Sequence, residues 1–220
     1  MSGAASGAAG RVAARVIRRA DRQVGQWRNG LGTTEEITAE PENSGNADPF
    51  AWRLSLARIG RDCPFSPFAG YDRTFMIVEG AGVTLSFGAA APDMRVDRRF
   101  APQPFDGGWP TDCWLIDGPA QALNVVSDRA RVVHRVAVVE APVGRTTAAV
   151  AGDHVLVHAL QGAAAVRLDG ASARLAEGDC WRVDRPAGAA ELVIEAERPA
   201  LIPALIYVVD LAVAAGRAAR

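Results

Sequence analysis

Three histidines are the first residues to examine for chemistry, because imidazole binds metals and transfers protons. His154 and His158 share one face of a predicted strand, but four residue steps separate their Cα atoms by about 13 Å. Ligands of a single zinc ion each lie about 2 Å from it. The three histidines therefore cannot converge on one ion, and no acidic residue stands at a spacing suited to complete a ligand set. The sequence therefore predicts no metal site and no cofactor, with all three histidines packed in strands or on their surface.

The sequence gives no more support for nucleophilic catalysis than for a metal site. Cys113 and Cys180 each stand beside a tryptophan, which is typical of core packing. Cys63 precedes a proline in a segment predicted to be an exposed loop, where an inert thiol is favoured over a reactive one. Ser55 and Ser66 have no histidine nearby in the sequence, so a catalytic triad is unsupported. We expect no catalytic residues, and the balance leans away from an enzyme.

Arginines and short polar residues offer binding instead. Arg53 and Ser55 project from one face of a predicted strand, because side chains alternate along it. Arg73 follows a loop, residues 65–68, whose aromatic side chains could wall a pocket. Arginine matches a carboxylate with two parallel hydrogen bonds, and a serine hydroxyl adds a short contact. The alternative is that both arginines are solvated on the surface, paired with a carboxylate such as Asp72.

Composition excludes several function classes. The 220 residues include 24 basic and 25 acidic ones, so the net charge of -1 disfavours a charge-driven nucleic-acid binder. Every basic residue is arginine, which excludes Schiff-base enzymes, P-loop ATPases and protein kinases, since each needs a lysine amine. Three cysteines without pair spacing fit a reducing compartment. With no signal core and no run of about 18 apolar residues, a cytoplasmic location is expected.

The elements that must position these residues are strands. Trp52, Leu54 and Leu56 alternate with Arg53 and more polar neighbours, which is typical of a strand with two unlike faces. Further short β-branched runs follow, separated by glycine turns, and they predict an all-β sandwich, jelly roll or barrel. Only residues 11–20 and the tail from residue 212 are expected to be helical.

An internal repeat predicts two related units. Residues 112–120 match residues 179–187 at seven of nine positions, counting one conservative change. A weaker similarity relates residues 77–81 to residues 159–163. We therefore expect one β unit over residues 11–140 and a second, degenerate one over 152–211, between a flexible N-terminus (1–10) and a flexible tail (212–220).

Four blocks occur in order in the first half, namely WRNGLGTTE (27–35), FAWRLSLA (50–57), PFSPFAGYDR (64–73) and GP followed by LNV (118–125). Together they resemble the HutD/Ves family over residues 27–131. The resemblance implies a cupin (RmlC-like jelly roll) double β-barrel, a bicupin fold, with a small-molecule pocket. It also implies a link to histidine utilisation for HutD members and to cold and stress responses for Ves members. The family tends to have an acidic residue just before Asn124, and its absence here leaves the subfamily open.

These observations combine into a binding hypothesis. The predicted ligand-binding residues come from the first half, where Asn124 stands opposite Glu191 of the second half in the repeat; they are Arg53, Ser55, Phe65, Ser66, Arg73 and Asn124. The expected ligand is a small anionic metabolite of histidine degradation, of the urocanate or N-formylglutamate class, bound without being transformed and with a regulatory role. The alternatives are a metal-independent isomerase or epimerase, a Ves-like stress-response protein, or an interaction scaffold without ligand. No nucleic acid or membrane partner is expected, and a homodimer stays open.

Overall fold

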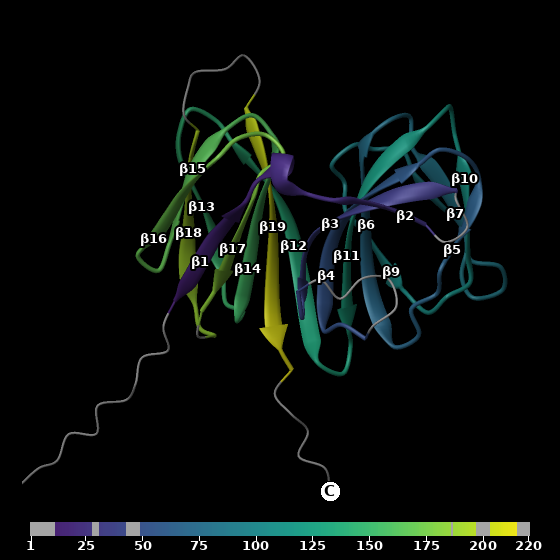
Figure 1. Cartoon of the computed structure of the whole chain (residues 1–220), viewed down its shortest axis with the longest axis horizontal. Coiled ribbons are helices and arrows are strands. Elements are labelled where there is room, and N and C mark those ends of the chain that lie inside the picture. The colour runs from purple at the N-terminus through teal and green to yellow at the C-terminus, as the bar shows by residue number, and fades with distance from the viewer. Residues whose placement is uncertain (1–11, 28–30, 43–48, 186, 197–202, 215–220) are drawn as a thin grey trace, which may run out of the picture. The chain divides into compact units, whose positions relative to one another are not determined.

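The chain folds as two β units. The computed structural model describes residues 12–27, 31–42, 49–185, 187–196 and 203–214. The first unit comprises residues 17–138 and 213–220, and the second comprises residues 1–16 and 139–212. Among the described residues, one short 3-10 helix, η1 (Arg19–Asp21), accompanies the strands of Figure 1. The expectation of an all-β jelly-roll protein is confirmed.

Two sheets form the first unit. The larger has the strand order β2-β3-β4-β11-β6-β9, with the bounds Val24–Gln26, Gly32–Glu40, Trp52–Ile59, Ala120–Asp128, Tyr71–Glu79 and Gln103–Asp106. The smaller has the order β5-β10-β7-β8, with the bounds Cys63–Phe65, Thr111–Leu115, Val83–Ser86 and Met94–Val96. One apolar cluster draws residues from both sheets, so they pack face to face.

The second unit has the same construction. Its larger sheet has the order β1-β17-β14-β19-β12, with the bounds Ala13–Ile17, Cys180–Asp184, His154–Gln161, Ala204–Val213 and Val132–Ala141. Its smaller sheet has the order β13-β18-β15-β16, with the bounds Gly144–Val150, Ala190–Ala196, Ala164–Leu168 and Ala171–Leu175. The division between the units falls within β12.

Strand β4 turns its more polar face toward the inside of the first unit. Arg53 and Ser55 share that face with Ile59, which belongs to the cluster between the two sheets. Trp52 and Leu54 point the opposite way and are also buried, with exposed fractions of 1% and 0%. The alternation was therefore correctly assigned to a strand, but its polar face is an interior face.

The strand orders show which strands of the two units are equivalent, and only one of the two sequence similarities joins equivalent strands. By position in the sheets, β6 corresponds to β14, β11 to β19, β9 to β17 and β10 to β18. The weaker similarity is topologically sound, because residues 77–81 end β6 and residues 159–163 end β14. The stronger one is not, because Cys113 lies in β10 whereas Cys180 lies in β17. Two short segments can thus have similar sequences without occupying equivalent positions in the fold.

Other expectations about local structure also differ from the observed fold. Residues 13–17 form strand β1 rather than a helix, and this strand clusters with the second unit, not with residues 11–140. Strand β19 extends through Val213, so the described part of the tail is not helical. The flexible N-terminus at 1–10 and most of the flexible tail at 212–220 lie outside the described residues. No described helix is long and apolar enough to span a membrane.

On the sheet face opposite Arg73, the half-buried His134 of β12 contacts the larger sheet of the first unit, within residues 17–138. His134 Nε2 lies 2.8 Å from Thr74 Oγ1, and His134 Nδ1 lies 2.6 Å from Ser127 Oγ. Thr74 and Ser127 are almost fully buried, with exposed fractions of 2% and 0%. Burial lowers the pKa of His134, partly offset by the negative charge of Asp72. The neutral imidazole is therefore the form that the folded chain favours.

We predict that His134 makes the protein less stable in mild acid. The unfolded chain binds a proton near the ordinary histidine pKa of about 6.5, above the lowered pKa of the folded state, so stability falls as pH drops through that window. His134→Gln should flatten this part of the profile. Melting temperatures from pH 5 to 8 for both proteins are the measurement, and parallel profiles would contradict the prediction.

Candidate functional site

Strand register places the predicted binding residues side by side. In the larger sheet of the first unit, Val126 of β11 is flanked by Arg53 of β4 and Arg73 of β6. One step along the same face, Asn124 is flanked by Ser55. Because directly opposed residues in antiparallel strands point to the same side, the two arginines, the serine and the amide share one interior face.

This face borders a cavity of about 570 Å³ within the first unit. All six predicted residues line it: Arg53, Ser55, Phe65, Ser66, Arg73 and Asn124. The cavity thus lies in the half that carries the sequence blocks. The fold brings the predicted residues together, whereas their binding of a ligand stays a prediction.

Other residues that the sequence did not predict for the site also line the cavity. Phe50 and Tyr71 stack at 5.0 Å between ring centroids, and the Tyr71 hydroxyl donates a 2.9 Å hydrogen bond to the Phe50 carbonyl. Trp27 donates to Thr34 Oγ1 at 2.6 Å, which fixes one further wall. Phe50 and Tyr71 both lie in the sequence blocks described above, so membership of these blocks could have indicated that they line the cavity.

The Arg73 guanidinium is held by one amide and several aromatic rings. Its Nε and Nη2 donate to Asn124 Oδ1 at 3.0 and 2.6 Å. The Arg73 Cζ atom lies 4.7 Å from the Phe65 ring centroid and 5.4 Å from that of Phe105. No carboxylate among the described residues forms an ion pair with it. Asn124 therefore acts here by orienting Arg73, since its carbonyl oxygen is already occupied.

Arg53 is held in a similar way. Its Cζ atom lies 4.6 Å from the Phe50 centroid and 5.5 Å from the Phe68 centroid. Burial lowers the pKa of Arg53, while the charge of Glu36 acts in the opposite direction. Cation–π stacking offsets part of the cost of removing a guanidinium from water. The aromatic residues of the cavity thus also support its cations.

The cavity is electropositive. The exposed fractions of Arg53 and Arg73 are only 6% and 8%, so the alternative of solvated surface arginines is wrong. Burial, and then repulsion from Arg53, lowers the pKa of Arg73 to about 10, so both guanidinium groups are charged at neutral pH. Two like charges in a poorly hydrated space favour an anion that neutralises them.

The described lining does not suit a metal ion. It provides no histidine, cysteine or carboxylate side chain, and the described residues contain no cluster of three such ligands. Both ring nitrogens of His134 already contact hydroxyl groups, and His154 Nδ1 lies 2.7 Å from Asp184 Oδ1 in the other unit. The ligand sets that metals prefer are built from those missing groups. The cavity fits an organic anion better.

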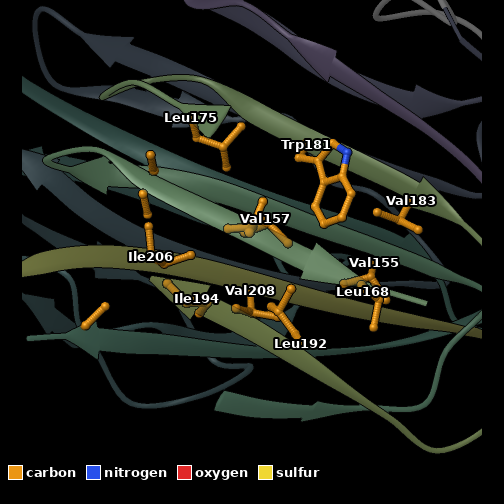
Figure 2. Packing of buried hydrophobic residues seen from close by; sticks show 14 of the residues in the cluster. Val155, Val157, Leu168, Leu175, Trp181, Val183, Leu192, Ile194, Ile206 and Val208 are labelled. Carbon is orange, nitrogen blue, oxygen red and sulfur yellow. The ribbon is translucent and has the colours of Figure 1, made fainter. Parts of the chain in front are cut away.

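The corresponding interior of the second unit is filled by apolar side chains. Aligning β14 with β6 and β19 with β11 places Val155 at the position of Arg73 and Val208 at that of Asn124. Glu191 lies in β18 and is not the counterpart of Asn124, which corrects the repeat-based assignment. Figure 2 shows Val155 and Val208 in a cluster with Trp181. The second unit therefore has packed apolar side chains at the positions where the first has Arg73 and Asn124 beside its cavity.

Two face-to-face sheets in each unit and a ligand-sized interior cavity define a protein of the cupin jelly-roll class. Oxalate decarboxylase from Lactobacillus farciminis, solved as a formate complex, has the same fold with a TM-score of 0.63, covering 88% of this chain and 85% of its own at 11% identity. At that identity the likeness concerns the fold alone. The family model HutD matches residues 19–202, and the chain belongs to the HutD family.

Individual relatives agree with this membership. The structure of HutD from Pseudomonas fluorescens, in a formate condition, is 29% identical with a TM-score of 0.74, covering 91% of this chain and 99% of that one. An uncharacterised protein in the hutC 3′ region of Pseudomonas putida is 36% identical over 101 residues, 46% of this chain. Protein Ves from Cronobacter sakazakii is 33% identical over 117 residues, 52% of this chain. The matches span 50% and 61% of these two curated relatives.

We predict opposite effects for two changes at Asn124. Asn124→Leu removes both acceptor contacts of a buried guanidinium and should destabilise the fold by about 2–4 kcal/mol. Asn124→Asp supplies a carboxylate in the same place, so it should retain stability while removing part of the positive charge of the cavity and weakening anion binding. Denaturant unfolding measures the first effect, and anion titration measures the second. Equal stability of wild type and Asn124→Leu would contradict the assigned role.

We also predict that protein purified without chelator contains far less than one transition-metal ion per chain, because the described cavity lacks suitable ligands. Elemental analysis of the purified protein is the measurement, with the same sample after chelator treatment as the baseline. About one ion per chain, lost on chelation, would overturn this expectation and direct attention to metal chemistry.

Proposed function

We propose that this chain is a HutD-type cupin that binds a small carboxylated metabolite of histidine degradation and takes part in regulating histidine utilisation in the cytoplasm. The ligand class is that of urocanate or N-formylglutamate. The family and the names of the relatives support the link to histidine utilisation. The paired buried arginines, Arg53 and Arg73, are the observation that carries the binding hypothesis.

The size and lining of the cavity support a small, partly planar ligand. Its volume of about 570 Å³ lies within the range usual for small-molecule sites. Rings from Phe50, Phe65 and Phe68 border it, so a conjugated or planar acid can lie against aromatic faces. The N–H groups of Arg73 Nη1 are not engaged by any described residue and can donate to a carboxylate. Ser55 and Ser66 add hydroxyl groups within the lining.

The charges support binding over proton transfer. A general base is usually a histidine, carboxylate, lysine or similar group near its operating pH. The described lining has arginines and Tyr71 as its titratable groups, and arginine stays protonated at neutral pH. These groups can fix and neutralise an acid more readily than they can abstract a proton. The isomerase or epimerase alternative would need a base from elsewhere.

We predict that removing either arginine weakens ligand binding. A charge-assisted contact contributes about 1.5–3 kcal/mol, so Arg53→Ala and Arg73→Ala should each reduce affinity by roughly 10- to 150-fold. Arg53→Lys should also lose affinity, because an ammonium group cannot reproduce the planar fork. Isothermal titration of urocanate and of N-formylglutamate into folded proteins measures these changes.

The same strand offers a matched control. Arg58 also lies on β4 but is exposed on the other face, so Arg58→Ala should bind as the wild type does. Methyl esters of the two acids test whether the carboxylate is the recognised group. Full affinity in both cavity alanine variants would refute the arginine site. Recovery of a chemically altered ligand would instead favour the enzyme alternative.

A further inference from the structure

Two of the three cysteines face each other across a pair of strands beside the cavity. In the antiparallel pairing of β5 with β10, Cys63 is the register partner of Cys113. Both thiols are free and buried, with exposed fractions of 5% and 0%, and both belong to the cluster between the sheets. The expectation that Cys63 lies in an exposed loop is therefore wrong. Cys180 lies in the other unit, where its register partner on β14 is His158.

The strand pairing gives these two cysteines a separation that suits a bond. Pro64 is the register partner of Asp112, and it has no N–H group with which to complete a hydrogen-bonded pair. The adjacent cysteine pair then takes the hydrogen-bonded position, where Cα atoms lie about 5.5 Å apart. Disulfides most often join residues with a Cα separation of about 5.5–6 Å, and both side chains point to the same face.

We propose that Cys63 and Cys113 form a reversible disulfide bond when the protein meets hydrogen peroxide. The Cys63 thiolate attacks a peroxide oxygen, and the O–O bond breaks to give a sulfenic acid and hydroxide, which takes up a proton as water. The Cys113 sulfur then attacks the sulfenic sulfur, the S–O bond breaks, and a second water leaves. Two thiols lose two electrons and two protons to the peroxide, which becomes two waters.

Burial of the two thiols makes this disulfide bond slow to form at neutral pH. Burial raises the pKa of both thiols, that of Cys113 to about 12. Because the thiolate is the nucleophile, oxidation should accelerate roughly tenfold per pH unit while the attacking thiol is mostly protonated. Cys63, the more exposed of the pair, is the first to react. Pro64 and Phe65 follow it directly and line the cavity, so the bond would fix the wall against which Arg73 stacks.

The test is oxidation of the folded chain with hydrogen peroxide at pH 7, 8 and 9, followed by alkylation and thiol counting in denaturant. We expect the count to fall from three to one, the mass to drop by about 2 Da, and peptide mapping to link Cys63 with Cys113. Dithiothreitol should restore all three thiols. The oxidised form should melt about 5–10 °C higher, because the bond closes a long loop.

The three cysteines supply their own controls. Cys180→Ser should form the bond as the wild type does, whereas Cys63→Ser and Cys113→Ser should not. If a serine variant fails to fold, the alanine variant or the wild-type peptide map gives the answer. The proposal would be overturned if all three thiols persist in the folded protein after peroxide treatment, or if the disulfide involves Cys180 or a second chain. Its failure would leave the anion-binding proposal untouched, because the latter depends on the arginines.

Discussion

The arrangement of the first unit depends on two guanidinium groups placed inside a protein. Arg53 and Arg73 flank Val126 in one row of the larger sheet, where water cannot fully solvate them. A buried charge is costly unless it is hydrogen-bonded, stacked or neutralised. Asn124 supplies the hydrogen bonds and the Phe side chains supply the stacking. A bound anion would supply further neutralisation, and this is the physical basis of the binding proposal.

The second unit shows what the same architecture does without those cations. Val155 and Val208 occupy the positions of Arg73 and Asn124, and Trp181 packs among their neighbours. The described side chains of the cluster between these sheets are apolar and pack against one another, which stabilises the fold. The strand correspondence supports the bicupin interpretation, with polar side chains on the interior face of one unit and apolar side chains at the matching positions of the other.

Much of this could be predicted from the sequence, for identifiable reasons. Period-two alternation at Trp52 to Leu56 indicates a strand, and the ordered blocks indicate the family and the residues that line the cavity. Alternation alone does not say which face is inside, because both faces of β4 are buried. The pairing of Cys63 with Cys113 also depends on long-range register, which no local pattern specifies.

The misleading repeat has a related cause. The strings around Cys113 and Cys180 agree in sequence, yet β10 and β17 belong to different sheets of their units, so the agreement does not mark equivalent positions. A fold accommodates many chemistries, so the residues on an interior face decide the function. Cupin enzymes that use a metal place histidines and a carboxylate there, whereas the described lining here has arginines, hydroxyls and an amide. Such donors recognise an acid by charge and shape, and this is why we assign the cavity to binding.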